Sequence, residues 1–198
     1  MVIPREPNLL LSNSNKRGLR RDYTPAPQVT LFYLLGALHD ATTRQTTYRI
    51  GSDSLNYCQL LKVGIYKLGA KAWIYQEGKN RKYWIVEFSK SLLKNLIIKS
   101  QQEKIDYIRG YFDTDGGIAK SPKIRFYIYF CQKDLNDLFE VRGYLSELGI
   151  SCGQMHNPSR KIDPNYWRFY ISAKSYSEFA KIIGSIHPEK SYILRMKI

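Results

Sequence analysis

The chain repeats one pattern of elements twice. An apolar segment that contains a glycine occurs at 31–42 and again at 105–116, and each copy is followed by a β-prone stretch. An amphipathic segment then ends in Leu-Gly in both copies. The spacing between matching residues grows slowly, from 74 residues between Gly36 and Gly110 to 80 between the two Leu-Gly stops. Short loop insertions in a duplicated unit produce such a drift, so the chain is predicted to be an internal duplication.

Each copy is predicted to form a helix, two strands, a second helix, two further strands and a closing helix. The second helix spans about 54–68 and 133–148, and Gly69 and Gly149 fit the left-handed position after a helix. In the first copy the predicted strands are 46–51, 70–76 and 83–89, and the closing helix is 91–98. In the second copy the predicted strands are 123–131, 150–156 and 166–172, and the closing helix is 174–183. Neither copy buries a large core alone, so we expect a pseudo-two-fold α+β fold.

The net charge is the second constraint. There are 31 Lys and Arg against 17 Asp and Glu, which gives +14 and a pI of about 9.6. This excess favours a polyanionic partner, either nucleic acid or an anionic membrane surface. No apolar stretch approaches the ~20 residues of a membrane span, and the N-terminus has no apolar signal region. The three cysteines are far apart, so we expect free thiols inside a reducing cell and no secretion.

Three segments are expected along the chain. Residues 1–28 contain four prolines and a basic cluster without periodicity, which predicts an extended N-terminal arm, either solvated or lying along phosphates. Repeat 1 would span 29–100 and repeat 2 would span 101–198.

Two carboxylates end the second apolar-glycine run. Residues 108–117 read I-R-G-Y-F-D-T-D-G-G, and acids are disfavoured at a helix C-terminus by the helix dipole. Free carbonyls and carboxylates that converge there suit a hard cation. The first run also ends in an acid, Asp40. If Gly36 and Gly110 allow the two helices to approach closely, the acids lie side by side and could hold divalent metals between two phosphates.

The second run resembles the LAGLIDADG motif, and the chain from about residue 29 onward resembles a monomeric two-repeat LAGLIDADG homing endonuclease of the archaeal, intron-encoded type. The resemblance implies an αββαββα unit used twice, with two antiparallel sheets that form a saddle over the DNA major groove. It also implies a site-specific, Mg²⁺-dependent double-strand cut in a long asymmetric site, by two-metal phosphodiester hydrolysis that leaves 3′ overhangs. Ca²⁺ or Mn²⁺ could replace Mg²⁺.

The family's essential acid lies five residues after the motif glycine. Asp115 matches that position in the second copy, but Ala41 occupies it in the first. Asp40 lies one residue earlier, which in an ideal helix means a rotation of ~100°. Asp40 could still be the partner acid and metal ligand if the last helical turn is distorted. Otherwise the site is defective or works with a single acid. His39 and Asp113 match a position that is usually structural.

Auxiliary residues are expected after the strand that follows each motif. Gln132 and Lys133 resemble a Gln-Lys pair of archaeal members, in which Gln would orient water and Lys would stabilise phosphate charge. The alternative is that Lys133 only opens a surface helix. The first repeat has Ser52 and Asp53 there, and we expect Asp53 to cap the next helix. The two half-sites are therefore predicted to be chemically unequal.

The DNA-reading surface is predicted from alternation along the strands. Ile124, Phe126, Ile128 and Phe130 are assigned to the core, and the intervening side chains to the wet face, whereas the assignment around Tyr48 and Arg49 is ambiguous. Basic turns at 77–82 and 159–161 would contact phosphates. The full set of candidates for DNA contact is Arg44, Tyr48, Arg49, Lys79, Arg81, Lys82, Lys120, Lys123, Arg125, Tyr127, Arg160, Lys161, Tyr166 and Arg168. The alternative is an ordinary solvated cationic face.

Double-stranded DNA is thus the expected partner, with a monomeric protein and no membrane. Two other functions stay open because of Ala41. One is a non-cleaving protein of the same fold, either a maturase that binds intron RNA or a degenerate endonuclease. The other is a plain basic DNA-binding protein. The expected location is inside the cell, in the cytoplasm of a prokaryote, with an archaeon favoured, or in an organelle.

Overall fold

The computed structural model describes residues 27–121 and 123–198, so the predicted arm lies outside the described residues except for the exposed Pro27 and Gln28. Repeat 1 contains α1 (Leu31–Ala37), the 3₁₀ turn η1 (Leu38–Asp40), β1 (Ala41–Thr43), β2 (Thr47–Ser52), α2 (Leu55–Lys67), β3 (Ala72–Gln76), β4 (Trp84–Ser89) and η2 (Lys90–Leu93). Repeat 2 contains α3 (Gln101–Asp115), β5 (Gly117–Ile118), β6 (Ile128–Gln132), α4 (Leu135–Glu147), β7 (Trp167–Tyr170), η3 (Ala173–Ser175), α5 (Tyr176–Ile182) and α6 (Pro188–Lys197).

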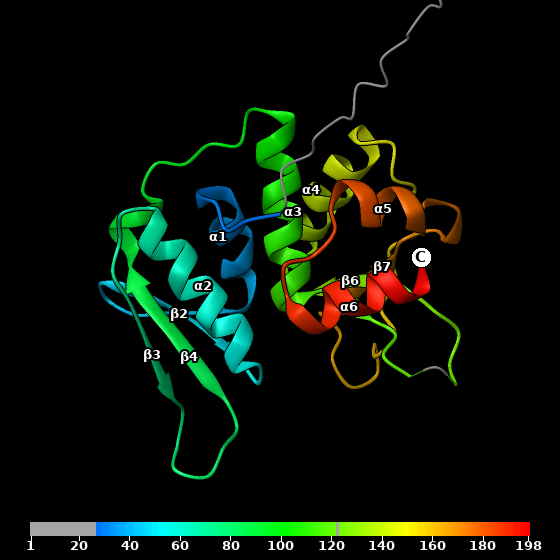
Figure 1. The fold of residues 1–198 in the computed structure, drawn as a ribbon. Helices are drawn as coiled ribbons and strands as arrows, with labels where there is room; N and C mark the ends of the chain where they lie inside the picture. Colours follow the sequence, from blue (N-terminus) through cyan, green and yellow to red (C-terminus); the bar gives the residue numbers. More distant parts are fainter. Residues whose placement is uncertain (1–26, 122) are drawn as a thin grey trace, which may run out of the picture.

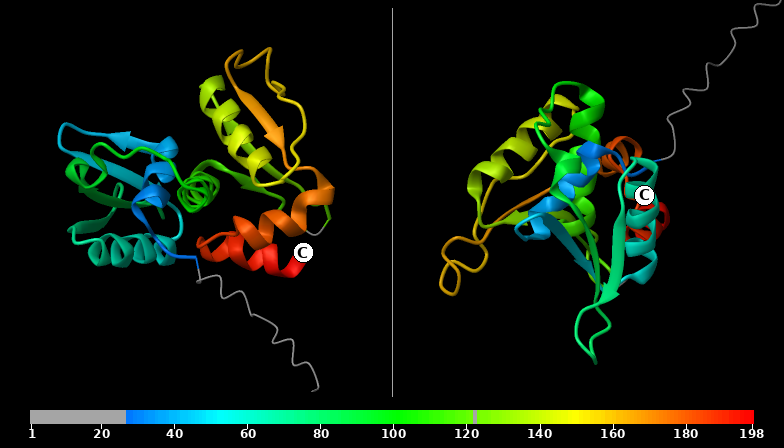
Figure 2. Two further views of the ribbon diagram at one scale, coloured as in Figure 1. Left: turned by 90° about the horizontal axis from the view of Figure 1, so that it is seen from above. Right: turned by 90° about the vertical axis from the view of Figure 1, so that its left-hand side faces the viewer.

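Each repeat builds its own antiparallel sheet and its own core. The sheet of repeat 1 has the order β1-β2-β4-β3, and that of repeat 2 has the order β5-β6-β7. Two separate clusters of buried apolar residues lie beneath them. Helices α1 and α3 run side by side between the two lobes (Figures 1 and 2). The predicted α+β duplication with two antiparallel sheets is therefore confirmed.

The second helix of each repeat begins and ends as predicted. Ser54 caps α2 by accepting from the Tyr57 amide, and Asp134 caps α4 by accepting from the Asn136 amide. Gly69 and Gly149 follow with φ of +84° and +75°, where a side chain would be strained. The predicted capping role of Asp53 is wrong, because its neighbour Ser54 fills it.

The strands of repeat 2 are shorter than predicted. β6 begins only at Ile128, because β5 pairs with no more than its first two residues. Ile124 is therefore 47% exposed in the preceding loop instead of buried in the core. The predicted strand 150–156 is reduced to two isolated bridges, Cys152↔Ile171 and His156↔Arg168. The two bridges are four residues apart in 152–156 but only three apart in 168–171. The segment 152–156 therefore has one extra residue that interrupts the ladder, as in a β-bulge.

Two helix predictions need correction. The closing helix at 91–98 is only the short turn η2, and Asn95 adopts a positive φ of 58°, which ends any helix. Conversely, α6 was not predicted, although Pro188 stands at its first turn, where proline is favoured. In the described part of the chain, no helix has the length and apolarity needed to cross a bilayer.

The crossing of α1 and α3 depends on two glycines. A Cβ atom on Gly36 would lie 1.9 Å from the Tyr107 carbonyl oxygen, and one on Gly110 would lie 1.9 Å from the Tyr33 carbonyl oxygen. The two contacts are symmetric, because each glycine meets the residue three positions before the other. Only glycine permits this approach, which brings the C-terminal ends of the two helices together as predicted.

Candidate active site

Two mirrored hydrogen bonds tie the helix crossing together. The Tyr33 hydroxyl donates to Asp113 Oδ2 over 2.8 Å. The Tyr107 hydroxyl lies 2.6 Å from His39 Nε2. Tyr107 matches Tyr33 and His39 matches Asp113 under the spacing of the motif glycines. His39 and Asp113 therefore link the repeats, which agrees with the structural role predicted for them.

The two motif helices end differently. Asp115 is the last residue of α3, whereas α1 stops at Ala37 and tightens into the turn η1, which ends at Asp40. A 3₁₀ turn has three residues per turn and a longer rise, so it changes the direction of the side chains that follow. The distortion on which the assignment of Asp40 depended is thus present. Ala41 already lies in extended backbone as the first residue of β1.

The charge of Asp40 acts on Asp115. Burial and the nearby Asp40 charge together raise the pKa of Asp115 to about 7, against the opposing effect of Lys190. Desolvation also raises the pKa of Asp40, although this residue reaches the surface. The raised pKa values mean that the surroundings do not fully compensate a negative charge on both carboxylates. Two such carboxylates fit a hard divalent cation such as Mg²⁺, which prefers oxygen ligands.

Gln132 bridges the two repeats at this site. Its Nε2 donates to Asp115 Oδ2 over 2.9 Å and lies 3.3 Å from the carbonyl oxygen of His39. The amide thereby orients the carboxylate of one repeat against the backbone of the other. Lys133 lies elsewhere: its side chain is 72% exposed, and its ammonium forms an ion pair with Asp163 at 3.2 Å. The structure therefore brings Gln132, but not Lys133, to the acids.

Repeat 1 offers no equivalent of this amide. Ser52 is the counterpart of Gln132 and accepts only from the Ser54 amide, 3.1 Å away. Asp53, the counterpart of Lys133, reverses the charge at that position. Asp53 and Asp40 share a pocket, which is lined by Asp40, Gly51, Ser52, Asp53, Tyr57, Tyr83, Asp113, Thr114, Lys120, His187, Glu189 and Lys190. The two halves of the site are chemically unequal.

Sequence reasoning missed Lys190 and His187, which lie on and beside α6. The Lys190 ammonium, in a residue only 9% exposed, contacts carbonyls at the end of α3. His187 is 6% exposed, and its ring packs at a tilt against that of Tyr57. Burial and the nearby Lys190 lower the pKa of His187 to about 4, so its imidazole is neutral. The proline that starts α6 was the signal for the helix. Nothing in the local sequence indicates that this helix reaches the motif.

The outer face of the first sheet carries a polar network centred on Glu87. Its carboxylate accepts from the Thr47 hydroxyl at 2.6 Å, from the Tyr75 hydroxyl at 2.6 Å and from Arg49 Nε at 3.1 Å. Arg49 therefore lies on the wet face, as expected for a DNA contact. The assignment of Tyr48 to DNA contact is wrong, because its ring packs on the core beside Phe88. Alternation from the buried Ile50 decides the face.

The outer face of the second sheet presents Arg168 among tyrosines. Its Nη1 and Nη2 atoms donate to the hydroxyls of Tyr170 and Tyr166, at 3.2 and 2.9 Å. The guanidinium stacks over the Tyr129 ring, 4.2 Å from its centroid. Tyr127 lies next to Tyr129 on this face. Unlike Arg49, Arg168 has no carboxylate partner among the described residues, so its positive charge is not neutralised locally.

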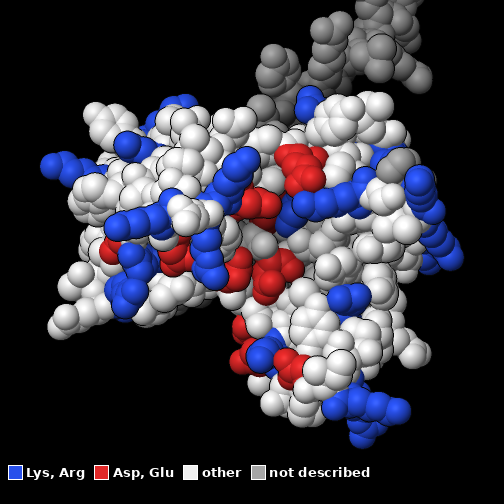
Figure 3. All heavy atoms as spheres, turned by 90° about the horizontal axis from the view of Figure 1, so that it is seen from below, with Lys and Arg blue, Asp and Glu red and all other residues white. Residues whose placement is uncertain are grey.

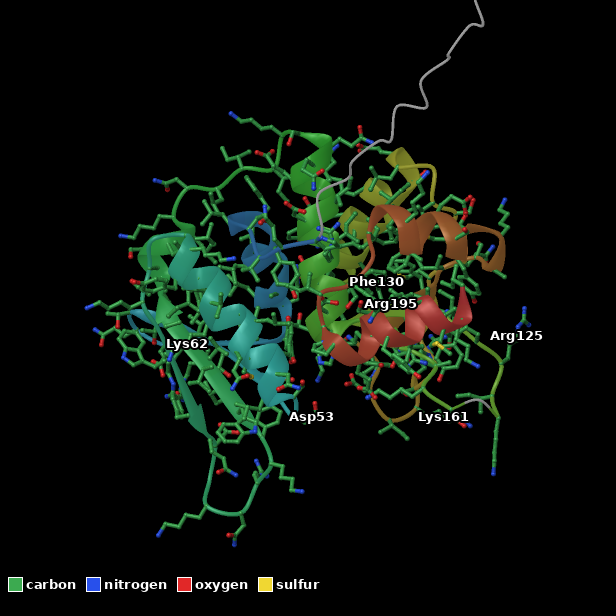
Figure 4. The ribbon with its side chains drawn as sticks, in the orientation of Figure 1. Asp53, Lys62, Arg125, Phe130, Lys161 and Arg195 are labelled. Carbon is green, nitrogen blue, oxygen red and sulfur yellow. The ribbon has the colours of Figure 1, made fainter. Side chains whose placement is uncertain are left out.

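The predicted basic contacts lie on exposed loops. They are Arg44 between β1 and β2, Lys79, Arg81 and Lys82 between β3 and β4, Lys120, Lys123 and Arg125 before β6, and Arg160 and Lys161 before β7. Figure 4 labels Arg125 and Lys161 on two such loops, and Asp53 near the junction of the lobes. Seen from below, carboxylates gather in the middle of the molecule with Lys and Arg around them (Figure 3). Acids at the centre and cations at the periphery suit a nucleic-acid backbone.

Two packed glycine-containing helices, each with an acid at or just beyond its end and each followed by an antiparallel sheet, form the two-repeat LAGLIDADG fold predicted from the sequence. Residues 102–184 match the family model described as a LAGLIDADG-like domain, so the predicted LAGLIDADG resemblance is confirmed. No curated protein sequence matches this chain.

Solved structures share the fold at low sequence identity. I-DmoI in complex with DNA and Ca is 20% identical, covers 84% of this chain and 96% of its own, and gives a TM-score of 0.61. I-DmoI in complex with DNA and Mn is 22% identical, covers 78% of this chain and 95% of its own, and gives a TM-score of 0.57. Full-length DUF199/WhiA from Thermatoga maritima is 17% identical, covers 84% of this chain and 59% of its own, and gives 0.63.

Proposed function

We propose that this protein is a site-specific DNA endonuclease of the homing type, which cuts both strands of a long asymmetric duplex in a metal-dependent reaction. The observation that carries the proposal is the juxtaposition of Asp40 and Asp115 at the ends of two crossed helices, between two sheets with polar outer faces. The solved structures of I-DmoI with target DNA and with Mn, Ca or Mg support the same substrate and cofactor class.

Asp40 and Asp115 are the residues that would hold Mg²⁺. Within residues 27–121 and 123–198, no three His, Cys, Asp or Glu side chains form a metal cluster, so DNA phosphates and water would complete the ligand set. When bound, the metal supplies an activated water and neutralises charge on the phosphate. Gln132 holds the Asp115 carboxylate in one orientation by donating to a single oxygen, Oδ2.

The surface supports an asymmetric DNA site. Arg168 offers an unneutralised guanidinium that can pair with a guanine edge, whereas the Arg49–Glu87–Tyr75 network offers donors and an acceptor. Because the two sheets differ, the two half-sites would differ in sequence. Since both repeats are in one chain, a monomer suffices, and 3′ overhangs follow from the family resemblance. The three free thiols suit the proposed location inside a cell.

The decisive experiment is cleavage of a supercoiled plasmid that carries the uninterrupted insertion site, that is, the joined flanks of the element encoding this chain. With Mg²⁺, the wild-type protein should produce linear DNA, and Asp115→Asn should bind the plasmid without cutting it. Linear product from both proteins would exclude a metal-holding role for Asp115. Tight binding by the wild type without any linear product would exclude the endonuclease.

The second candidate is a non-cleaving binder of DNA or intron RNA with the same fold. Ala41 in place of the expected acid, and Ser52 in place of the amide, favour it. The similar DUF199/WhiA domain is described only as a LAGLIDADG domain. The same plasmid assay distinguishes this candidate, because binding would persist and cleavage would be absent.

A further inference from the structure

Lys190 is a buried lysine whose three ammonium protons are all directed at the end of one helix. Its Nζ lies 2.6 Å from the Phe112 carbonyl oxygen, 3.0 Å from that of Asp113 and 2.6 Å from that of Gly116. A lysine ammonium has three donors, so these contacts satisfy it completely. The three acceptors flank Asp115 on both sides in the chain. Lys190 belongs to α6 and lies 74 residues or more beyond these acceptors in the chain.

Helix ends leave their last carbonyls without partners, and a cation there also opposes the helix dipole. At α3 the ammonium of Lys190 meets both needs, and the helix continues in α geometry as far as Asp115. At the end of the first motif no lysine ammonium of the described residues contacts a carbonyl; the Gln132 amide lies 3.3 Å from the His39 carbonyl oxygen, and the chain tightens into η1. The acid follows its glycine by five residues in α3 and by four in α1.

We propose that Lys190 is a positioning residue for the acid pair: it holds the last turn of α3 in α geometry and so sets the place of Asp115 opposite Asp40. The inference rests on the proposed endonuclease function, because the placement matters for catalysis. This role of Lys190 also explains why the two motif helices end differently. Helix α6 has no counterpart in repeat 1, so only the second motif receives this cap, and the first carries its acid one residue earlier.

The test compares Lys190→Met with Lys197→Met. Lys197 lies on the same helix but is exposed, so its replacement removes the same charge without touching α3. Amide hydrogen exchange of residues 113–116 is measured without DNA, and cleavage at saturating DNA is measured with Mg²⁺. DNA affinity is measured separately with Ca²⁺. A merely structural role would weaken all three properties together, whereas a positioning role separates cleavage from affinity.

For Lys190→Met we expect exchange at the end of α3 to rise at least about tenfold, since hydrogen bonds to a charged donor are lost. We expect cleavage to fall about 10²-fold, the effect of a misplaced catalytic group, with DNA affinity within about threefold of wild type. Lys197→Met should behave as wild type. Unchanged exchange, or unchanged cleavage, would overturn the inference.

If the methionine variant does not fold, Lys190→Arg keeps the charge, but its planar fork does not match three converging carbonyls. We then expect reduced cleavage, and a wild-type rate would overturn the inference. If the wild-type protein itself does not cleave, the proposed function fails. The exchange comparison still decides whether Lys190 holds the last turn of α3.

Discussion

Replacing Gly110 with alanine tests the helix crossing on which the candidate site depends. The new Cβ would lie 1.9 Å from the Tyr33 carbonyl oxygen, 2.8 Å from its carbonyl carbon and 3.0 Å from the Ala37 amide nitrogen. All three atoms are backbone, so no side chain can rotate away, and α1 must move away from α3 by roughly 1–2 Å to restore van der Waals contact. Overpacking a core costs about 1–3 kcal/mol when side chains can adjust. We therefore expect a loss of at least about 3 kcal/mol in the free energy of unfolding.

The assay is urea denaturation followed by circular dichroism, with Gly143→Ala as the matched control. Gly143 lies inside α4, and a Cβ there would meet nothing within 4 Å, so alanine should stabilise the protein by about 0.5–1 kcal/mol. The two substitutions are chemically identical and should have opposite signs. A Gly110→Ala variant within about 1 kcal/mol of wild type would refute the close backbone approach. In a folded variant, cleavage should fall as well, because the acids separate.

Three other predictions concern the acids and the DNA face. Asp115→Asn should increase the free energy of unfolding of the metal-free protein at pH 8 by roughly 2–4 kcal/mol. The reason is that ionising a carboxyl with a pKa of about 7 destabilises the folded state relative to the unfolded chain. This cost of ionisation is absent near pH 4 and complete above pH 7. The stabilities of the two proteins, measured by thermal unfolding, should therefore converge in acid. A difference in stability that does not change with pH would contradict the raised pKa of Asp115. Gln132→Ala should lower cleavage while leaving DNA binding intact, measured by single-turnover kinetics; an unchanged rate would mean that Asp115 needs no orienting amide. Arg168→Ala should relax base preference at one position and cost about 1–3 kcal/mol of discrimination, whereas Lys161→Ala should only reduce the salt dependence of binding. Equal effects of these two variants on base preference would argue against direct reading by Arg168.

Much of the candidate site could be predicted from local sequence. Residue types with strong conformational preferences mark the repeat, the Leu-Gly helix ends and the motif glycines. For this reason α2, α4 and the crossing of α1 and α3 were correctly predicted. The resemblance indicated that Gln132 belongs to the site, and the structure places its amide on Asp115. Predictions failed where pairing partners decide the outcome. The first half of the predicted strand 123–131 is not a strand, because β5 pairs only with Ile128 and Tyr129. Tyr48 faces the core, because it lies on the same face of the strand as the buried Ile50.

The sequence by itself determined the duplicated architecture, the cationic surface and the two motif acids, because each depends on short-range patterns or on composition. The tertiary structure alone decided which charges act at the site. It directed Lys133 to Asp163, placed Glu87 beside Arg49, and brought Lys190 from an unpredicted helix onto the end of α3. These outcomes depend on contacts between residues dozens of positions apart. Such contacts form only when the elements of each repeat pack into their tertiary arrangement, and no local pattern encodes them.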